Sequence, residues 1–322
     1  MYPAAFEYYR ATSVPEVVQL LQQHPDGKIL AGGHSLLPMM KLRLAEPAAL
    51  IDIGRVPDLN GIQDAGDSIV VGATTTYWNL LQSDVIRQSL PLITEAANVV
   101  GDIQVRNRGT LGGAMAHADP AADMPAVALA LDASMKVVGP NGERTIPASE
   151  FFVDMFTTAL SPDEVLTQII FPKPQGTSGQ AYEKFAHPAS GYAVVGVAAF
   201  VTLDGGKVQT VRVGITGAGT VAKRASAVEQ ALAGQEPTEQ AIESAAAHAA
   251  EGLELNGDIF ASEEYRAHLA RVFTQRALSR AVAAIRPPPF VIIGEPSQPH
   301  TLKNMSLGVT SGAGSPVTSL TG

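Results

Sequence analysis

The stretch Lys28–Arg43, KILAGGHSLLPMMKLR, runs from a short apolar segment through a glycine pair into an amphipathic segment. This order predicts a strand, a tight turn and a helix. Gly32 and Gly33 lack a Cβ, so their backbone can approach a ligand closely. His34 and Ser35 fall at the expected helix start, where unpaired amides and the helix dipole favour an anion. The stretch therefore predicts a phosphate-binding turn, and a plain strand-turn-helix connection is the alternative.

A second glycine pair lies in the segment TLGGAMAHADPAAD. Thr110, Gly112 and Gly113 repeat the combination of a hydroxyl and two flexible glycines, so two such loops can hold one diphosphate from both sides. Arg106 and Arg108 are expected on the loop just before them, where they either balance phosphate charge or are solvated. The pair of loops favours a nucleotide-type cofactor over an isolated turn.

Asp123 and Asp119 flank a proline-containing turn ahead of an apolar helix expected at 124–131. At that position the residue pattern alone predicts that Asp123 is the N-cap of the helix. A contact with a ligand is the alternative interpretation.

The composition excludes several classes of protein. The 322 residues are 46% hydrophobic, enough for a substantial core. The net charge is −9, from 22 basic and 31 acidic residues, and no basic stripe alternates with aromatics as in a nucleic-acid-binding surface. The sequence has no cysteine, so it cannot form a disulfide or hold an iron–sulfur cluster through cysteine.

Targeting and metal signals are also missing from the pattern. The opening MYPAAFEYYR does not resemble a signal peptide, and no apolar run reaches about 18 residues. The 7 histidines show no metal-ligand spacing. We therefore expect a cytoplasmic protein that is not integral to a membrane and has no metal site of its own.

The N-terminal part alternates helices and strands, which predicts a small α/β lobe. Ser13 and Glu16 form a capping-box pattern for a helix ending near Gln23. The helix after the first glycine pair is expected to end near Leu44, ahead of Pro47. Further strands are expected at 50–53, 68–72, 134–138, 144–146 and 164–171, and a helix at 91–100. The strands at 134–138 and 144–146 are expected to form a hairpin around Pro140–Gly142.

The segment PKPQGTSG, residues 172–179, is the expected domain boundary. Beyond it, strands at 182–185, 193–203 and 207–216 predict an antiparallel meander, with helices at 222–233, 238–253 and 262–285. This is an α+β domain with its helices on one face of a sheet. After Arg286 the composition turns to Pro, then Gly, Ser and Thr, which predicts an extended or disordered tail at 287–322.

The segment Gly217–Ala222 matches the dinucleotide-binding pattern G-x-G-x-x-A between a strand and a helix. A Rossmann unit needs a second parallel strand after that helix, yet an alanine-rich helical stretch follows. The Gly205-Gly206 turn also ties the preceding strand into a hairpin. We therefore expect no NAD site here.

Taken together, AGGHSLLPMMKLRLAEPAALIDI and TLGGAMAHADPAAD resemble the FAD-binding medium subunit of molybdenum hydroxylases, closest to the aerobic carbon monoxide dehydrogenase type. The resemblance extends over about residues 1–286 and includes KFAHPASGYAVVGVAA. It implies an α+β fold with a vanillyl-alcohol-oxidase-like, PCMH-type FAD-binding domain at 1–176. This domain would consist of α/β subdomains at about 1–55 and 56–176, with a C-terminal domain at 177–286.

The resemblance also implies which residues contact FAD. The two glycine loops would supply Ile29, Leu30, Ala31, Gly32, Gly33, His34, Ser35 and Leu36, and then Thr110, Gly112, Gly113 and Ala114. Ala114 stands where the family often has Asn, so a backbone contact alone is expected there. Val100 and Leu166 fall at apolar contacts, and Lys184 at a lysine that approaches the cofactor.

Two further assignments change the interpretation of single residues. Asp123 resembles the carboxylate that holds cofactor hydroxyls, which replaces the cap interpretation. Tyr192 resembles the tyrosine that lies against the isoalloxazine ring, where an aromatic side chain tunes the flavin. Without the family, a core tyrosine at the start of a strand remains an alternative for Tyr192.

The implied function is electron transfer. A large partner subunit would carry the molybdenum cofactor and a small partner subunit the 2Fe–2S clusters, in a dimer of heterotrimers. The chain itself would hold FAD, with no catalytic residue and no metal. Carbon monoxide is the first candidate substrate of the complex, and xanthine, aldehydes and N-heterocycles stay open. A stand-alone flavin oxidase would need a catalytic base near the flavin, and the sequence offers no candidate cluster for it. A scaffold without FAD would not need both glycine loops.

Overall fold

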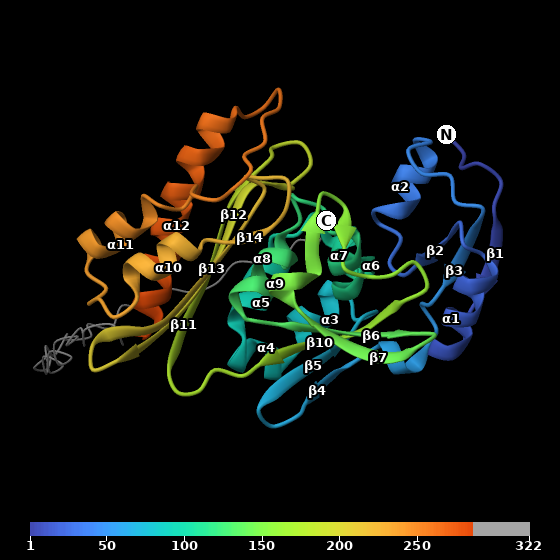
Figure 1. Ribbon diagram of the computed structural model, residues 1–322, viewed down its shortest axis with the longest axis horizontal. Helices are drawn as coiled ribbons and strands as arrows, with labels where there is room; N and C mark the ends of the chain where they lie inside the picture. Colours follow the sequence, from blue (N-terminus) through green and yellow to red (C-terminus); the bar gives the residue numbers. More distant parts are fainter. Residues whose placement is uncertain (286–322) are drawn as a thin grey trace, which may run out of the picture. The chain divides into compact units, whose positions relative to one another are not determined.

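The chain begins with a small parallel sheet in the computed structural model (Figure 1). Its strands pair in the order β1-β3-β2: β1 (Glu7–Arg10), β3 (Ala49–Asp52) and β2 (Gly27–Leu30). The hydroxyl of Ser13 accepts a hydrogen bond from the amide of Glu16 at the start of α1 (Val14–Gln23), as the capping box predicts. The α/β lobe expected from the sequence is present.

α2 (Leu36–Lys41) follows β2 through the first glycine pair, with Ser35 at its N-cap. The predicted order of strand, turn and helix is therefore confirmed. The helix ends earlier than predicted, before Leu44, because Arg43 has a φ of 62°. A residue in this left-handed region cannot continue an α-helix.

An antiparallel sheet forms the centre of the next region, with strand order β4-β5-β10-β6-β7. Its strands are β4 (Ile62–Asp64), β5 (Ser68–Gly72), β10 (Val165–Pro172), β6 (Ser134–Gly139) and β7 (Gly142–Pro147). The predicted hairpin around Pro140–Gly142 is confirmed, since β6 pairs with β7 there. β1 and β4 are strands that the sequence analysis missed.

This region also contains short helices and the 3₁₀ turn η1. They are η1 (Pro57–Leu59), α3 (Tyr77–Gln82), α4 (Asp84–Ser89), α5 (Pro91–Asn98), α6 (Ile103–Arg108), α7 (Leu111–His117), α8 (Asp123–Ala130) and α9 (Ala148–Phe151). The expectation that Arg106 and Arg108 lie on a loop is wrong, because they form the last turn of α6. The Asp102 side chain caps this helix by accepting from the amide of Val105.

A four-stranded antiparallel sheet follows, after the small hairpin β8 (Phe152–Asp154) and β9 (Thr157–Thr158). Its strands are β11 (Ser178–Ala186), β12 (Ala193–Asp204), β13 (Lys207–Thr216) and β14 (Lys223–Arg224). The predicted meander is confirmed, since β12 pairs antiparallel with both β11 and β13.

Both faces of this second large sheet are covered (Figure 1). On one face lie α10 (Ser226–Leu232), α11 (Glu239–Ala246) and α12 (Glu263–Ile285). On the other face, Tyr182, Ala198 and Phe200 share a core with residues of α5 and α8. β12 is buried on both sides, which explains its long apolar run. Side chains of β11 therefore reach α8.

The structure describes residues 1–285, which fall within one compact unit. The tail expected at 287–322 lies outside the described residues. Among the helices of the described part, none is long and apolar enough to cross a membrane.

Candidate cofactor site

The structure brings the two glycine loops into contact. A Cβ on Gly32 would collide with the backbone carbonyl of Arg108, which lies just before the second loop. Gly109, the next residue, leaves room for the Tyr77 ring, because a Cβ on Gly109 would lie 2.9 Å from Tyr77 Cε2. The close approach of two backbones at Gly32 is what a glycine permits.

The first loop presents backbone donors without partners. Among the residues that the structure describes, no acceptor receives a hydrogen bond from the amides of Gly32, Gly33, His34 or Ser35. Gly33 has a φ of 78°, a conformation that favours glycine. The loop is anchored through its carbonyls, which accept from the amides of Leu37 and Met39. A run of unpaired amides at a helix start fits the phosphate oxygens of a dinucleotide.

The second loop is different, because its amides already donate within the chain. Leu111 donates to the carbonyl of Thr75 at 2.9 Å, Gly112 to that of Ala73 at 2.9 Å, Gly113 to the Thr110 hydroxyl at 3.1 Å and Ala114 to the Thr110 carbonyl at 3.1 Å. A Cβ on Gly112 would lie 2.5 Å from the Cβ of Ala73. Gly112 therefore serves close packing, and the two loops are not equivalent.

Asp123 is held by two side chains from β11. Its Oδ1 accepts from the Tyr182 hydroxyl at 2.6 Å, and its Oδ2 accepts from Lys184 Nζ at 2.9 Å. Burial raises the pKa of Asp123, while the charge of Lys184 and both hydrogen bonds oppose this rise. The N-cap of α8 is Ala122, so the cap interpretation of Asp123 is wrong. A carboxylate has about four acceptor positions, so Asp123 keeps capacity for a ligand hydroxyl.

Lys184 is buried with Asp123, the two side chains being 4% and 6% exposed. Its Nζ also donates to the carbonyl of Val99 at 3.0 Å. This contact ties β11 to the turn after α5, where the predicted contact residue Val100 lies half-buried against the core. Lys184, Asp123 and Val100 are thus brought together by the fold.

Tyr192 precedes β12 and is 43% exposed, so it is not the core tyrosine that the residues alone left open. Burial and the nearby charge of Asp119 raise the pKa of Tyr192, and the neighbouring Ser35 side chain opposes this rise. Tyr192 therefore faces the first glycine loop. Its own loop is held by His187, whose Nδ1 accepts from the amide of Ser190 at 3.2 Å.

The other predicted residues have structural positions of their own. Ile29 and Leu30 lie on β2, Ala31 and Leu36 are half-buried on either side of the first loop, and His34 is exposed. Leu166 lies on β10 and is 5% exposed in the same core as Met115 and Met124. Its side chain is part of this core rather than of an open surface.

The NAD-like segment Gly217–Ala222 follows an antiparallel strand. β13 pairs antiparallel with β12 and with β14, so no parallel crossover exists there. The amide of Gly217 donates to the carbonyl of Pro120, and its carbonyl accepts from Arg266 Nη1 at 2.6 Å. These contacts hold the glycine turn in the core.

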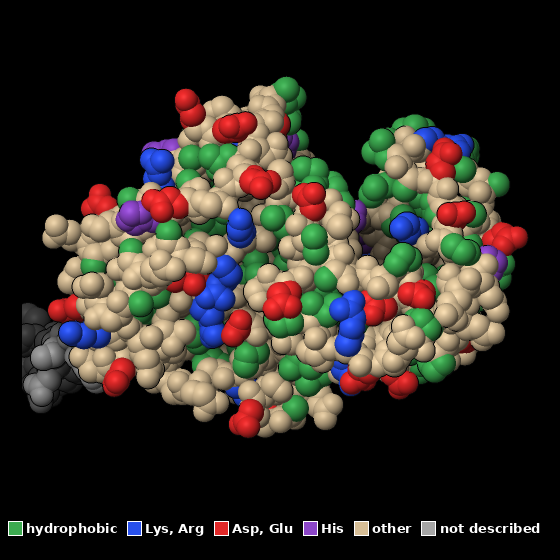
Figure 2. All heavy atoms as spheres, viewed as in Figure 1, with side chains coloured by type: hydrophobic (Ala, Val, Ile, Leu, Met, Phe, Trp, Pro, Cys, Tyr) green, Lys and Arg blue, Asp and Glu red, His purple; other side chains and the backbone are tan. Residues whose placement is uncertain are grey.

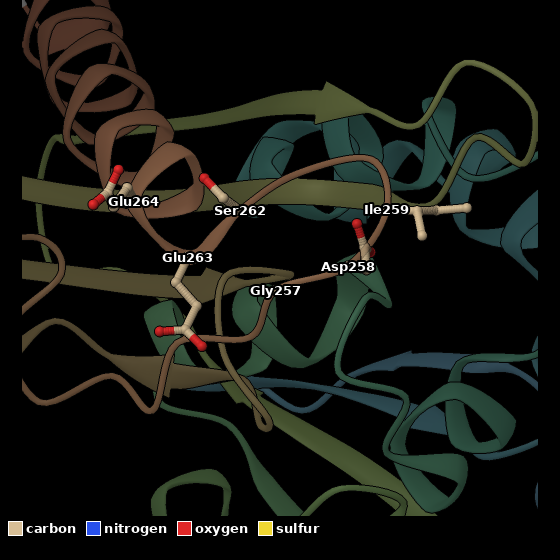
Figure 3. A pocket seen from close by; sticks show the side chains of 6 residues that line it. All are labelled: Gly257, Asp258, Ile259, Ser262, Glu263 and Glu264. Atoms are coloured by element: carbon tan, nitrogen blue, oxygen red, sulfur yellow. The ribbon is translucent and has the colours of Figure 1, made fainter.

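A hollow at the start of α12 is lined by three acidic residues together with Gly257, Ile259 and Ser262 (Figure 3). The side chains of Glu263 and Glu264 point in different directions there. Asp258 is already bound, since its carboxylate accepts from Arg266 Nη2 and from the amides of Phe260 and Ala261. This hollow has no converging set of ligand groups.

Charged side chains are interspersed on the face drawn in Figure 2, with Lys and Arg lying among Asp and Glu. Nucleic-acid surfaces instead gather basic residues on one face. The face drawn in Figure 2 therefore lacks the pattern of a nucleic-acid-binding surface.

Two protein-family models match the chain. Residues 4–174 match the FAD binding domain in molybdopterin dehydrogenase, and residues 180–281 match the CO dehydrogenase flavoprotein C-terminal domain. The chain belongs to the FAD-binding subunits of molybdopterin dehydrogenases. The resemblance identified from the glycine loops is confirmed, as is the α+β fold that it implies.

Curated relatives cover nearly the whole described chain. The carbon monoxide dehydrogenase medium chain of Hydrogenophaga pseudoflava is 41% identical over 284 residues, covering 88% of this chain and 99% of the relative. Subunit alpha of the 6-hydroxypseudooxynicotine dehydrogenase complex of Paenarthrobacter nicotinovorans is 38% identical, covering 89% and 98%. A solved carbon monoxide dehydrogenase from H. pseudoflava, lacking the Mo-pyranopterin moiety, matches with a TM-score of 0.87, 42% identity and coverage of 89% and 100%.

Sequence reasoning missed two residues near Asp123 in this FAD-binding subunit. Tyr182 donates to the Asp123 carboxylate, and Gly196 lies against the Tyr182 hydroxyl. Tyr182 and Lys184 lie two residues apart on β11, so their side chains leave the same face of the strand. That alternation was visible in the sequence. The partner, Asp123, is 59 residues away from Tyr182 along the chain, and only the fold reveals the contact.

Proposed function

We propose that the chain is the FAD-carrying electron-transfer subunit of a three-subunit molybdenum hydroxylase of the carbon monoxide dehydrogenase type. The observation that carries the proposal is the row of unpaired amides at Gly32–Ser35 in a chain of this family. When bound, FAD supplies the ability to take up electrons and pass them on, which protein side chains do not provide.

The residues of the chain then have separate roles. The first glycine loop binds the diphosphate through its amides, and the second fixes the start of α7 against Ala73. Asp123 orients cofactor hydroxyls as an acceptor. Tyr192, facing Ser35, covers one side of the ring system and limits access of water to it. The remaining predicted contacts, at Val100, Ala114, Leu166 and Lys184, complete the proposed FAD site.

Partners complete the reaction in this proposal. A large subunit would oxidise the substrate at a molybdenum cofactor, and a small subunit would carry electrons through 2Fe–2S clusters to this chain. Its relatives include medium chains and subunits of multi-subunit dehydrogenases, which supports the assignment. We extend the proposal to a cytoplasmic dimer of heterotrimers, which native mass measurement and cell fractionation of the tagged chain test.

Carbon monoxide is the substrate we propose first, because the C-terminal part matches the CO dehydrogenase flavoprotein model over residues 180–281. The complex isolated through this chain should reduce an artificial electron acceptor when supplied with carbon monoxide. Reduction with xanthine, an aldehyde or an N-heterocycle instead would transfer the proposal to that substrate class.

FAD binding tests the core of the proposal. The purified full chain, alone and in its native complex, is titrated with FAD and followed by flavin fluorescence and thermal unfolding. Binding should stabilise the fold by about 2.7 kcal/mol at a hundredfold excess over Kd. A folded chain that takes up no FAD in either form would contradict the function, and a flavin homo-oligomer free of molybdenum and iron would favour a stand-alone oxidase.

A further inference from the structure

Tyr182 makes a contact for which packing gives no reason. Its side chain is 5% exposed in the core, and its hydroxyl donates to Asp123 Oδ1 at 2.6 Å. A phenylalanine would fill the same apolar space without a polar group to satisfy. The tyrosine therefore places a hydroxyl beside a buried carboxylate, on the side opposite to Lys184.

The neighbouring strand leaves space for this hydroxyl. A Cβ on Gly196 of β12 would collide with the Tyr182 hydroxyl oxygen and lie 2.9 Å from Thr216 Cγ2. A glycine inside a strand weakens it, and close approach of another group is a common reason for its presence. The absence of a side chain at Gly196 thus leaves the space that the Tyr182 hydroxyl occupies.

The backbone of Tyr182 is fixed independently of its side chain. Its amide donates to Glu95 Oε2 at 2.8 Å, and its carbonyl accepts from Arg280 Nη1 at 3.0 Å. Arg280 also forms an ion pair with Glu183 at 2.6 Å. Removal of the hydroxyl alone should therefore leave β11 in place.

We propose that Tyr182 is a positioning residue that keeps the Asp123 carboxylate oriented and ionised for the hydroxyls of the cofactor. This inference rests on the proposed function, in which Asp123 contacts FAD. Lys184 holds one carboxylate oxygen and Tyr182 the other, so the carboxylate cannot rotate, and the lone pairs left over point to a fixed place.

The ionisation of Asp123 depends on all groups that face it. Burial raises its pKa, and Tyr182 and Lys184 oppose that rise. Tyr77 of α3 and Tyr192 also sense the Asp123 charge, which raises the pKa of each. Of the two side chains that donate to Asp123, only Tyr182 can lose its hydrogen bond through removal of a single oxygen atom without a change in charge.

The test compares FAD affinity against pH for the full wild-type chain and Tyr182→Phe, by flavin fluorescence. Without the hydroxyl, Asp123 should protonate at higher pH, so the acid side of the affinity profile should move up by about one pH unit. At higher pH, where Asp123 is ionised in both proteins, the affinities should converge. An unmoved profile, or an equal loss of affinity at every pH, would overturn the inference.

Tyr9→Phe is the matched control. The Tyr9 hydroxyl also donates to a carboxylate at 2.6 Å, that of Glu7, but at an exposed position on β1. Its profile should coincide with that of the wild type. A shift equal to that of Tyr182→Phe would show a general effect of losing such a bond and would overturn the inference.

A double-mutant cycle tests whether Gly196 acts through the Tyr182 hydroxyl. Gly196→Ala should move the acid side in the same direction as Tyr182→Phe, and it should add little when combined with Tyr182→Phe, because both act through one hydroxyl. Full additivity of the two effects would contradict this coupling.

The Asp123 carboxyl can also be titrated by carbon-13 NMR without FAD, where Tyr182→Phe should raise its pKa. A wild-type chain that binds no FAD would refute the proposed function, while an unchanged carboxyl pKa would refute this inference separately.

Discussion

The two glycine pairs of this protein have the same residues but different surroundings. At Gly32-Gly33 the loop amides have no partner within the described chain, whereas at Gly112-Gly113 they donate to Ala73 and to the Thr110 hydroxyl. One loop is open to an anion, and the other is a packed joint. A glycine pair before a helix therefore indicates close approach, and the structure decides whether a ligand or the protein itself approaches.

The largest effect should come from the packed joint. Gly112→Ala would place a Cβ 2.6 Å from the carbonyl oxygen of Ala73, where backbone has to move. We expect the free energy of unfolding, measured by denaturant titration, to fall by about 2–3 kcal/mol. Gly257→Ala is the control, because its Cβ would meet only ordinary contacts from 3.4 Å, and it should change stability by less than about 0.5 kcal/mol. Equal losses of stability in the two variants would contradict the assignment of Gly112 to a tightly packed position.

The open loop should respond mainly in FAD affinity. Gly33→Ala forces a side chain into a φ of 78°, at a cost of about 1–2 kcal/mol, and it should weaken FAD binding about tenfold or more by turning the amides. Gly142→Ala is a matched control with a φ of 104° and open space in the β6–β7 turn. It should lose less stability than Gly33→Ala, whose Cβ would also meet Leu37 Cδ1 at 2.9 Å, and it should keep normal FAD affinity. Normal affinity in Gly33→Ala would contradict the assignment of this loop.

A smaller effect is expected at the cap of α7. Thr110→Ala removes the acceptor for the Gly113 amide and should lower the free energy of unfolding by about 1 kcal/mol, while Thr110→Ser should keep the cap. Thr238→Ala removes an equivalent cap from α11, where the hydroxyl accepts from Ala241 at 3.1 Å. Both Ala variants should lose similar stability, and only Thr110→Ala should alter FAD affinity. Identical affinities would show that the cap does not serve the cofactor.

The smallest effect concerns an ion pair outside both loops. Hydrogen bonds from Arg144 at 2.7 Å lower the pKa of Glu164. A lowered pKa stabilises the fold above the ordinary glutamate value of about 4.3, and this contribution disappears as the pH falls through the lowered pKa. Glu164→Gln should therefore flatten the acid limb of the stability profile without moving the FAD profile. A shifted FAD profile would mean that the pair belongs to the site.

The sequence predicted those elements whose signals are local. The capping box at Ser13, the turn at Pro140–Gly142 and the strand-turn-helix at Lys28–Lys41 all depend on neighbouring residues. The end of α2 was missed because the left-handed Arg43 carries no glycine or proline signal. The family resemblance predicted which residues contact FAD, and the structure supplied the hydrogen bonds among these residues.

The unequal roles of the two loops could not be predicted from sequence, because they depend on contacts between distant segments. Ala73 meets Gly112 only in the folded chain, and Arg108 meets Gly32 in the same way. Asp123 shows the same limit. Its position at the start of an apolar helix suggested a cap, while its actual partners, Tyr182 and Lys184, come from another sheet. Long-range partners decide what a locally ambiguous residue does.

The most direct test of the account is amide hydrogen exchange of the full chain with and without FAD, followed by mass spectrometry on peptides covering the two loops. The account predicts that amides at Gly32–Ser35 exchange fast without FAD and become protected when FAD binds, since they have no partner in the chain. The amides from Leu111 to Ala114, already bonded, should be protected in both states. Protection gained at the second loop, with none at the first, would contradict it.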